Sequence, residues 1–269
     1  MMALAQRLLD FRELDLLAGG VSAVHRIDAR AKVLVALVFL ICVTSFERHA
    51  LAPLLPYFAF PIVVAAWAGL PAGLVARKAA LVLPFALAVG IASPWFERHE
   101  IARLAGFEFS AGWLSLASIV LRSLLAGAAA VVLVAVTGFP SLCGALARLG
   151  VPRPFVVQLM FLYRYLTVLG EEAARMMAAR EQRACGRRLS LAGFGVLAGQ
   201  LLLRSFDRAQ RIYRAMRARG FDGEFHGATP VRLIAHDVVA AAGCCALLVA
   251  LRVGDVAGRL GELALGGWR

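Results

Sequence analysis

The sequence predicts an all-α membrane protein, built as a bundle of about five to six transmembrane helices with long cytoplasmic helices attached. The chain of 269 residues is 61% hydrophobic, with a mean hydropathy of +0.77. Charged residues make up only 17%, against about 25% in an ordinary soluble domain. The apolar residues form long runs, which are typical of membrane-spanning helices. These observations exclude a soluble globular protein, a disordered chain and a small disulfide-rich scaffold.

Charge-free stretches mark the expected spans. Residues 33–46 are short for a span, and Lys32 could lengthen it by extending its side chain toward the membrane surface. A second span is expected within 50–73, where four prolines predict kinks. The remaining spans are expected over 79–96, about 113–139 and about 233–251.

The distribution of Lys and Arg predicts the orientation, because these residues resist translocation. The N-terminal arm, Arg77 and Lys78 are placed on the cytoplasmic side. Four regions follow: 1–32 as a cytoplasmic N-terminal arm, 33–151 as a transmembrane bundle, 152–232 as a cytoplasmic region, and 233–269 as a final span and C-terminal tail. The number of spans and the side of the C-terminus stay open.

An arginine-rich segment occupies residues 152–226. It contains 13 arginines and 6 acidic residues, for a local net charge of +7 (13 minus 6). Its apolar pieces, 155–163 and 189–203, are each too short to cross about 30 Å of hydrocarbon comfortably. We expect helices that lie near the membrane face or project from it. The net charge of +12 for the whole chain indicates cytoplasmic loops rather than nucleic-acid binding, because Lys and Arg resist translocation.

Motifs for catalysis and cofactor binding are missing from the sequence. Neither lysine follows a glycine, so no phosphate-binding P-loop is possible. His99 and Glu100 begin like a zinc-protease motif that lacks its second histidine, and no GxSxG elbow occurs. The five cysteines form neither a CxxC pair nor a Cys/His cluster. We expect no catalytic residue, no cofactor and no tight metal binding by this chain.

Two arginine-rich helices are the most informative feature of the sequence. They are expected over residues 171–185 and about 205–219, with acidic residues at the start of the first and arginines toward both ends. Each finishes in Ala-x-Gly, and the two glycines are 34 residues apart. The candidate site residues all lie at these two helix ends: Arg183, Ala184, Cys185, Gly186, Arg187, Ala218, Arg219 and Gly220.

The two helix ends suit insertion into two equivalent sites on a partner, where arginine would pair with carboxylates in a planar, bidentate way. The alternative is a solvated basic face, or one that rests on anionic lipid head groups. In the second helix, an apolar stripe at helical spacing is formed by Phe206, Ala209, Tyr213 and Met216. The arginines at 208, 211 and 219 point largely away from that stripe.

On these residues the chain resembles the transmembrane (T) component of energy-coupling-factor (ECF) transporters, of the cobalt/nickel CbiQ type. Residues 25–32 (HRIDARAK) are similar to the family's HRLDPRAK, with Ala29 replacing the usual proline. Residues 213–223 (YRAMRARGFDG) match the second coupling helix closely. Further matching elements are Thr137–Pro140, Leu149–Pro152, Tyr163–Tyr165, Glu171 and Arg204–Phe206.

The resemblance covers nearly the whole chain. It implies a non-catalytic coupling subunit of an ATP-driven cobalt or nickel importer in a bacterial inner membrane, with a cytoplasmic N-terminus. It implies that the coupling helices dock into two ATP-binding subunits, where ATP is hydrolysed. A substrate-binding S component of the CbiM type would be held in the membrane and tilted to release its substrate. The choice between cobalt and nickel stays open.

One departure from the family pattern concerns the first coupling motif. Cys185 stands where the family usually has arginine, so either Arg183 or Arg187 substitutes, or the first contact is mainly steric. Two other function classes compete with a coupling subunit, namely a self-contained permease and an intramembrane enzyme. The enzyme would need paired polar residues within the spans. Its only candidates are Arg122, His236 and Asp237.

Overall fold

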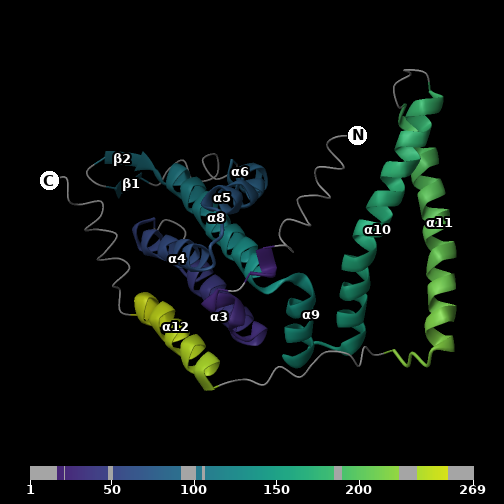
Figure 1. Cartoon of the computed structure of the whole chain (residues 1–269). Coiled ribbons are helices and arrows are strands. Elements are labelled where there is room, and N and C mark those ends of the chain that lie inside the picture. The colour runs from purple at the N-terminus through teal and green to yellow at the C-terminus, as the bar shows by residue number, and fades with distance from the viewer. Residues whose placement is uncertain are drawn as a thin grey trace. The chain divides into compact units, whose positions relative to one another are not determined.

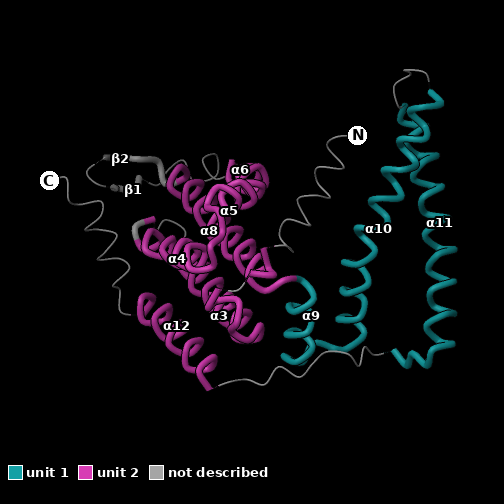
Figure 2. The backbone as a smooth tube through the Cα atoms, in the orientation of Figure 1, with its two compact units in different colours: residues 1–16, 139–230 teal, residues 17–138, 231–269 magenta. Residues whose placement is uncertain are grey.

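The computed structural model describes residues 17–20, 22–47, 51–91, 101–104, 107–184, 190–223 and 235–253. The chain divides into two compact units, which Figure 2 distinguishes by colour. One unit comprises 1–16 and 139–230, and the other comprises 17–138 and 231–269. Each unit is described by itself below.

Helices build almost all of the described structure (Figure 1). The unit of 17–138 and 231–269 contains α2 (Ala23–Arg26), α3 (Ala29–Thr44), η1 (Ala52–Phe58), α4 (Ala59–Trp67), α5 (Ala72–Ala79), η2 (Ala80–Val82), α6 (Leu83–Gly90), β1 (Ile101–Leu104), β2 (Phe107–Ser110), α8 (Ala111–Thr137) and α12 (Ala235–Val253). The other unit contains α9 (Phe139–Arg148), α10 (Arg153–Arg183) and α11 (Leu191–Ala218).

The prediction of an all-α membrane protein is confirmed. Among the described residues, three helical stretches are long and apolar enough to cross a membrane: Ala72–Gly90, Gly112–Thr137 and Ala235–Val253. The last two agree with the expected fourth and final spans. The first begins seven residues before the expected third span, so the helix includes Arg77 and Lys78. The sequence analysis did not predict the two-stranded antiparallel hairpin of β1 and β2.

Two prolines of the second expected span lie in a stretch of 3-10 helix. Pro53 and Pro56 belong to η1, which has 3-10 rather than α-helical geometry and is followed directly by α4. The kinks that we expect from the prolines stay a prediction. After α4, Gly69 adopts a φ of 67°, and the amide of Leu70 donates to the carbonyl of Ala65 at 2.9 Å. This is a Schellman ending, and Pro71 then caps the start of α5.

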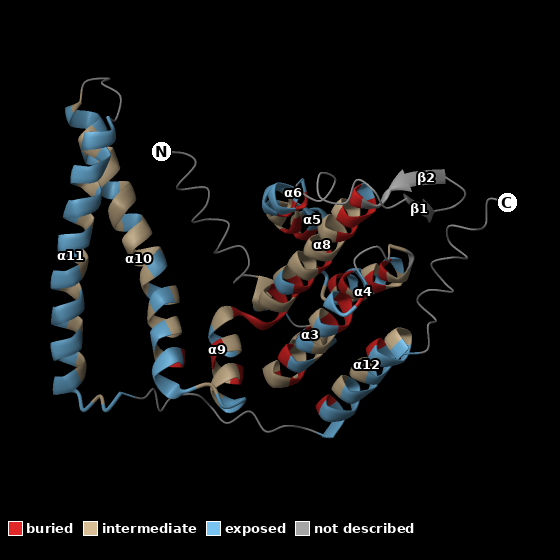
Figure 3. Ribbon diagram, turned by 180° about the vertical axis from the view of Figure 1, so that it is seen from behind, coloured by how far each residue is buried: buried red, intermediate tan, exposed pale blue. Residues whose placement is uncertain are grey.

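The core of this unit lies where α3, η1, α8 and α12 meet. Phe39, Leu54, Tyr57 and Leu125 are essentially fully buried there. The hydroxyl of Tyr57 donates to the carbonyl of Leu248 at 3.1 Å, which satisfies the one polar atom of a buried aromatic side chain. The outer faces of α3 and α12 carry many exposed apolar residues (Figure 3). Such faces suit contact with lipid.

Arg122, an arginine inside an expected span, has a structural partner. Its guanidinium donates to the backbone carbonyl of Glu47, just beyond the end of α3. Arg252 of α12 serves the same helix end, donating to the carbonyl of Ser45 at 2.9 Å while its guanidinium lies 4.3 Å from the ring centre of Phe46. Both arginines thus bind the carbonyl end of a helix, where positive charge is stabilising.

In the other unit, the two expected coupling helices are longer than predicted. The apolar piece 155–163 and the charged segment that follows form one helix, α10, of 31 residues. The expected second helix begins at Leu191 rather than near residue 205, so α11 has 28 residues. The expected boundaries lie where the composition of each helix changes. The helices continue across Gly170 and Ser205 at these points, and no proline interrupts the backbone hydrogen bonds there.

Candidate functional site: the helical hairpin of α10 and α11

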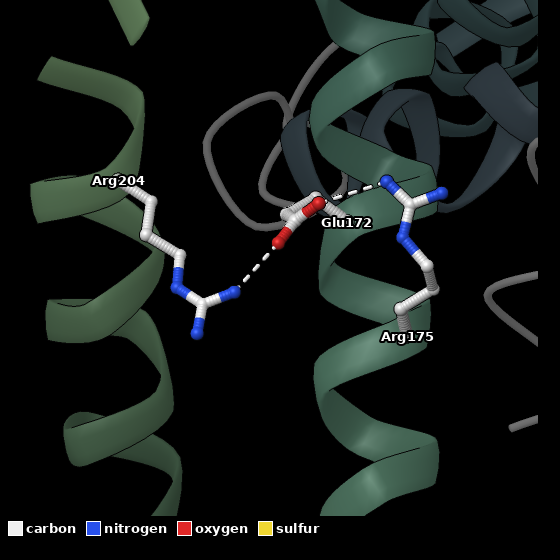
Figure 4. Close-up of polar contacts among 3 residues, drawn as sticks. All are labelled: Glu172, Arg175 and Arg204. Atoms are coloured by element: carbon white, nitrogen blue, oxygen red, sulfur yellow. Dashed lines mark hydrogen bonds and ion pairs between the residues drawn. The ribbon is translucent and has the colours of Figure 1, made fainter. Parts of the chain in front are cut away.

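The helices α10 and α11 form an antiparallel hairpin joined near mid-length by Glu172 (Figure 4). One carboxylate oxygen of Glu172 accepts a hydrogen bond from Arg204 of α11 at 2.8 Å. The other accepts from Arg175, one turn along the same helix, also at 2.8 Å. The carboxylate thus receives two charge-assisted hydrogen bonds, one of which crosses between the helices.

These two partners stabilise the ionised form of the Glu172 carboxyl. Hydrogen bonds from Arg175 and Arg204 hold the pKa of the Glu172 carboxyl below its ordinary value. The Glu172 side chain is only 17% exposed, whereas Arg175 and Arg204 are 62% and 60% exposed. Because solvent screens both arginines, the pair sets the register of the two helices more than it stabilises the fold.

The partly buried face of α11 differs from the apolar stripe noted in the sequence. The half-buried residues of its second half are Ser205, Arg208, Ile212 and Met216. Phe206 and Tyr213 are instead 60% and 58% exposed. These residues continue a partly buried row that includes Leu197 and Leu201, at spacings of three and four residues. The aromatic side chains of the predicted stripe therefore remain exposed beside the arginines.

The end of α11 has the geometry predicted for a glycine cap. Gly220 has a φ of 80°, in the left-handed region. Its amide donates to the carbonyl of Arg217 at 3.0 Å, and the amide of Phe221 donates to the carbonyl of Met216 at 3.0 Å. Together these bonds form a Schellman motif. Arg219 immediately precedes the turn and is exposed, so its guanidinium is presented at the helix terminus.

The other candidate helix end is described only in part. Helix α10 ends at Arg183, which is exposed, and Ala184 is its C-cap. The backbone amide of Ala184 donates a hydrogen bond to the carbonyl of Arg180 at 2.9 Å. Cys185, Gly186 and Arg187 lie outside the described residues. Whether the two helix ends are alike therefore stays a prediction.

A short turn positions the start of the hairpin. Helix α9 ends in a second Schellman turn, in which Gly150 has a φ of 98° and the amide of Val151 donates to the carbonyl of Leu146 at 3.1 Å. Pro152 then caps α10. Across this turn the rings of Phe139 and Tyr163 stack with their centres 4.5 Å apart. The Leu-Gly-Val-Pro element noted in the sequence is thus the hinge from which α10 starts.

Sequence reasoning missed Glu172 and the role of Arg204 as its partner. The neighbouring Glu171 was singled out, but Glu172 is the residue that reaches α11. The only local signal was the three-residue spacing of Glu172 and Arg175. Nothing in the sequence indicates a pairing between residues 32 positions apart.

The described residues contain no group of three or more His, Cys, Asp or Glu side chains that could hold a metal ion. The features that the structure does offer at this site are charge, an exposed helix end and an interhelical ion pair. Such features suit binding to another protein.

Comparison with known proteins indicates a transport family. Residues 20–230 match a protein family named CbiQ and described as cobalt transport protein. A protein of Methanocorpusculum labreanum, described as a fused cobalt transport protein CbiMQ, is 30% identical over 120 residues. That alignment covers 44% of this chain and 20% of the archaeal protein, so the chain corresponds to a minor part of that relative.

Proposed function

The chain belongs to the CbiQ family of cobalt transport proteins, and we propose that it is the transmembrane coupling subunit of an ATP-driven metal-ion importer of the ECF type. In this proposal it is not an enzyme, and ATP is hydrolysed by partner subunits. Its task is to transmit their movement to a substrate-binding protein in the membrane. The observation that carries the proposal is the hairpin of α10 and α11, with a structured arginine end on α11.

The dimensions of the hairpin support docking to two ATP-binding subunits. With 28 residues, α11 is about 42 Å long. The end of α10 at Ala184 lies near the start of α11, whereas Arg219 lies at its far end. The two candidate contacts are therefore separated by nearly the full length of α11, which exceeds the reach of one contact patch. Two partner molecules, each taking one helix end, fit this spacing better than one.

The name of the archaeal relative supports a membrane partner. That protein is described as CbiMQ, a fusion whose name combines CbiM with CbiQ. We infer that this chain associates with a separate S component of the CbiM type. Cobalt is the substrate class that the family description supports, and the S component would bind it.

The proposed arrangement in the membrane follows the basic residues. Residues 33–151 would supply most of a multi-pass bundle in a bacterial inner membrane, and 233–269 the last span and tail. The N-terminal arm of 1–32 and the region of 152–232 would be cytoplasmic. This places the arginine-rich half of α11 in water, where ATP-binding subunits are found.

The test is purification of the tagged full chain from its native membranes in mild detergent, comparing Arg219→Glu with Arg211→Glu. Both arginines are exposed on α11, but Arg211 lies about 12 Å before the helix end. A charge reversal in a buried ionic contact typically costs about 2–5 kcal/mol. We expect Arg219→Glu to lose the ATP-binding subunits while Arg211→Glu retains them. Equal retention by both variants at high salt would refute docking through this helix end.

A further inference from the structure

The unit of 17–138 and 231–269 contains a cavity with an unusual distribution of polar groups. Its volume is about 210 Å³, and it lies among α2, α3, α4, α8 and α12. Apolar side chains form nearly all of its wall, among them Val35, Val64, Trp67 and Val132. Its polar lining groups are Lys32 and Thr137. The cavity therefore suits a long apolar molecule with one polar end.

Both polar groups have unused hydrogen-bonding capacity. The ammonium of Lys32 donates to the carbonyl of His25 at 3.1 Å and to that of Val136 at 3.3 Å, which leaves one of its three donors. Thr137 is 7% exposed, and its hydroxyl has no hydrogen-bond partner within the described part of the chain. The Thr137 hydroxyl oxygen itself has almost no accessible surface, so the remaining donor of Lys32 is the polar group offered to a ligand in the cavity.

The charges around Lys32 indicate which kind of ligand atom it can bind. The carboxylates of Asp28 and Asp237 are buried, and both act electrostatically on Lys32. His236 lies on the far side of Asp237, with its Nδ1 3.7 Å from a carboxylate oxygen. Two carboxylates already balance the lysine, so a further anion such as phosphate is disfavoured. A neutral acceptor, such as an ester carbonyl, meets no such repulsion.

The polar groups also lie together at the termini of three helices. Lys32 is in the first turn of α3, Thr137 is the last residue of α8, and Asp237 is in the first turn of α12. Three helix termini thus meet at the polar end of an apolar cavity. Helix termini of a membrane bundle lie near the interface, which is where the ester groups of bilayer lipids are found.

We propose that this cavity is a lipid site that holds the ester group and the first methylene groups of one acyl chain of a bilayer phospholipid. The ester carbonyl at the head of the chain accepts a hydrogen bond from Lys32. An apolar cavity of about 150 Å³ in a soluble protein binds benzene, so this larger apolar cavity has room for a short stretch of hydrocarbon. The lipid completes the packing between α3, α4, α8 and α12, independently of any ATP-binding partner.

The first experiment uses the wild-type chain in vesicles of phosphatidylethanolamine and phosphatidylglycerol that contain a phosphatidylcholine probe with a diazirine in its acyl chain. After photolysis and digestion, mass spectrometry should find the label on peptides that contain Val64 or Val132. Excess unlabelled phosphatidylcholine should compete for this labelling. Labelling spread evenly over all exposed helix faces, or confined to peptides that do not line the cavity, would overturn the proposal.

The second experiment measures lipid retained by the delipidated full chain, using native mass spectrometry. Ala241→Leu fills the cavity, whereas Ala246→Leu adds the same side chain to an exposed position of α12 that does not line it. The wild type and Ala246→Leu should retain one phospholipid per chain, and Ala241→Leu at least ten times less.

Other occupants give distinguishable outcomes. If a partner protein fills the cavity, Ala241→Leu loses that partner and leaves lipid retention unchanged, which refutes the lipid site. If the cavity selects free carboxylates, oleate displaces phospholipid from the wild type, which refutes recognition of an ester. Loss of the ATP-binding subunits on Arg219→Glu, by contrast, tests the coupling function alone and has no bearing on the lipid.

Discussion

Replacing Gly220 tests whether the turn after α11 must have left-handed geometry. The φ of 80° at this residue lies in a region that costs an ordinary L-residue about 1–2 kcal/mol. A Cβ added here would meet no atom within 4 Å, so the cost is purely one of backbone conformation. Asparagine tolerates this region better than alanine, and a β-branched residue tolerates it least. We therefore expect destabilisation of the turn to increase from Gly220→Asn through Gly220→Ala to Gly220→Val.

The magnitude can be measured through the two hydrogen bonds that close the turn. They are donated by the amides of residue 220 and Phe221, both at 3.0 Å from their acceptors. A loss of 1–2 kcal/mol raises the open population about 5–30-fold. Amide hydrogen exchange at these two positions should accelerate by the same factor in Gly220→Ala, and by more in Gly220→Val. Cobalt uptake by the assembled complex should fall in the same order, at unchanged membrane expression.

Gly199→Ala is the matched control. Gly199 lies within α11, and a Cβ there also meets no atom within 4 Å, but its φ is not in the left-handed region. Alanine should stabilise the helix at this position by about 0.5–1 kcal/mol. Wild-type exchange rates at residue 220 and Phe221 in Gly220→Val would refute the argument. So would an equal loss of uptake in Gly199→Ala.

Three further predictions concern the hairpin and the metal. Arg219→Ala should reduce cobalt uptake far more than Arg187→Ala, and an equal or larger loss from Arg187→Ala would show that the first helix end is also charge-driven. Because the pKa of Glu172 is lowered, its contribution to the contact between α10 and α11 is present at neutral pH. That contribution should be lost as the pH falls below the ordinary glutamate pKa of 4.5. Distance measurements between spin labels on the two helices should show this loss in the wild type. Glu172→Gln should show no such acid sensitivity. Equilibrium dialysis of the purified chain against micromolar cobalt should detect no stoichiometric binding, and one bound ion per chain would contradict assignment of the metal site to a partner.

Local features of the molecule could be predicted from the sequence because their causes are local. The apolar runs predicted spans at about 113–139 and about 233–251, close to the observed helices 112–137 and 235–253, since twenty apolar residues satisfy their backbone polar groups only within a helix when they lie in a membrane. Gly220 predicted the left-handed turn, because glycine adopts that geometry without steric cost. The motifs around these elements carried the family resemblance, which the match over residues 20–230 confirms.

Only the tertiary structure decided which residues meet. The partner of Glu172 could not be read from the sequence, because Arg204 lies on another helix and several arginines were available to it. The partly buried face of α11 includes Ile212 rather than Tyr213, although the sequence allows either row. The apolar cavity is lined by five helices from distant parts of the chain, α2, α3, α4, α8 and α12. Long-range packing of this kind depends on the joint fit of many side chains, which no local pattern records.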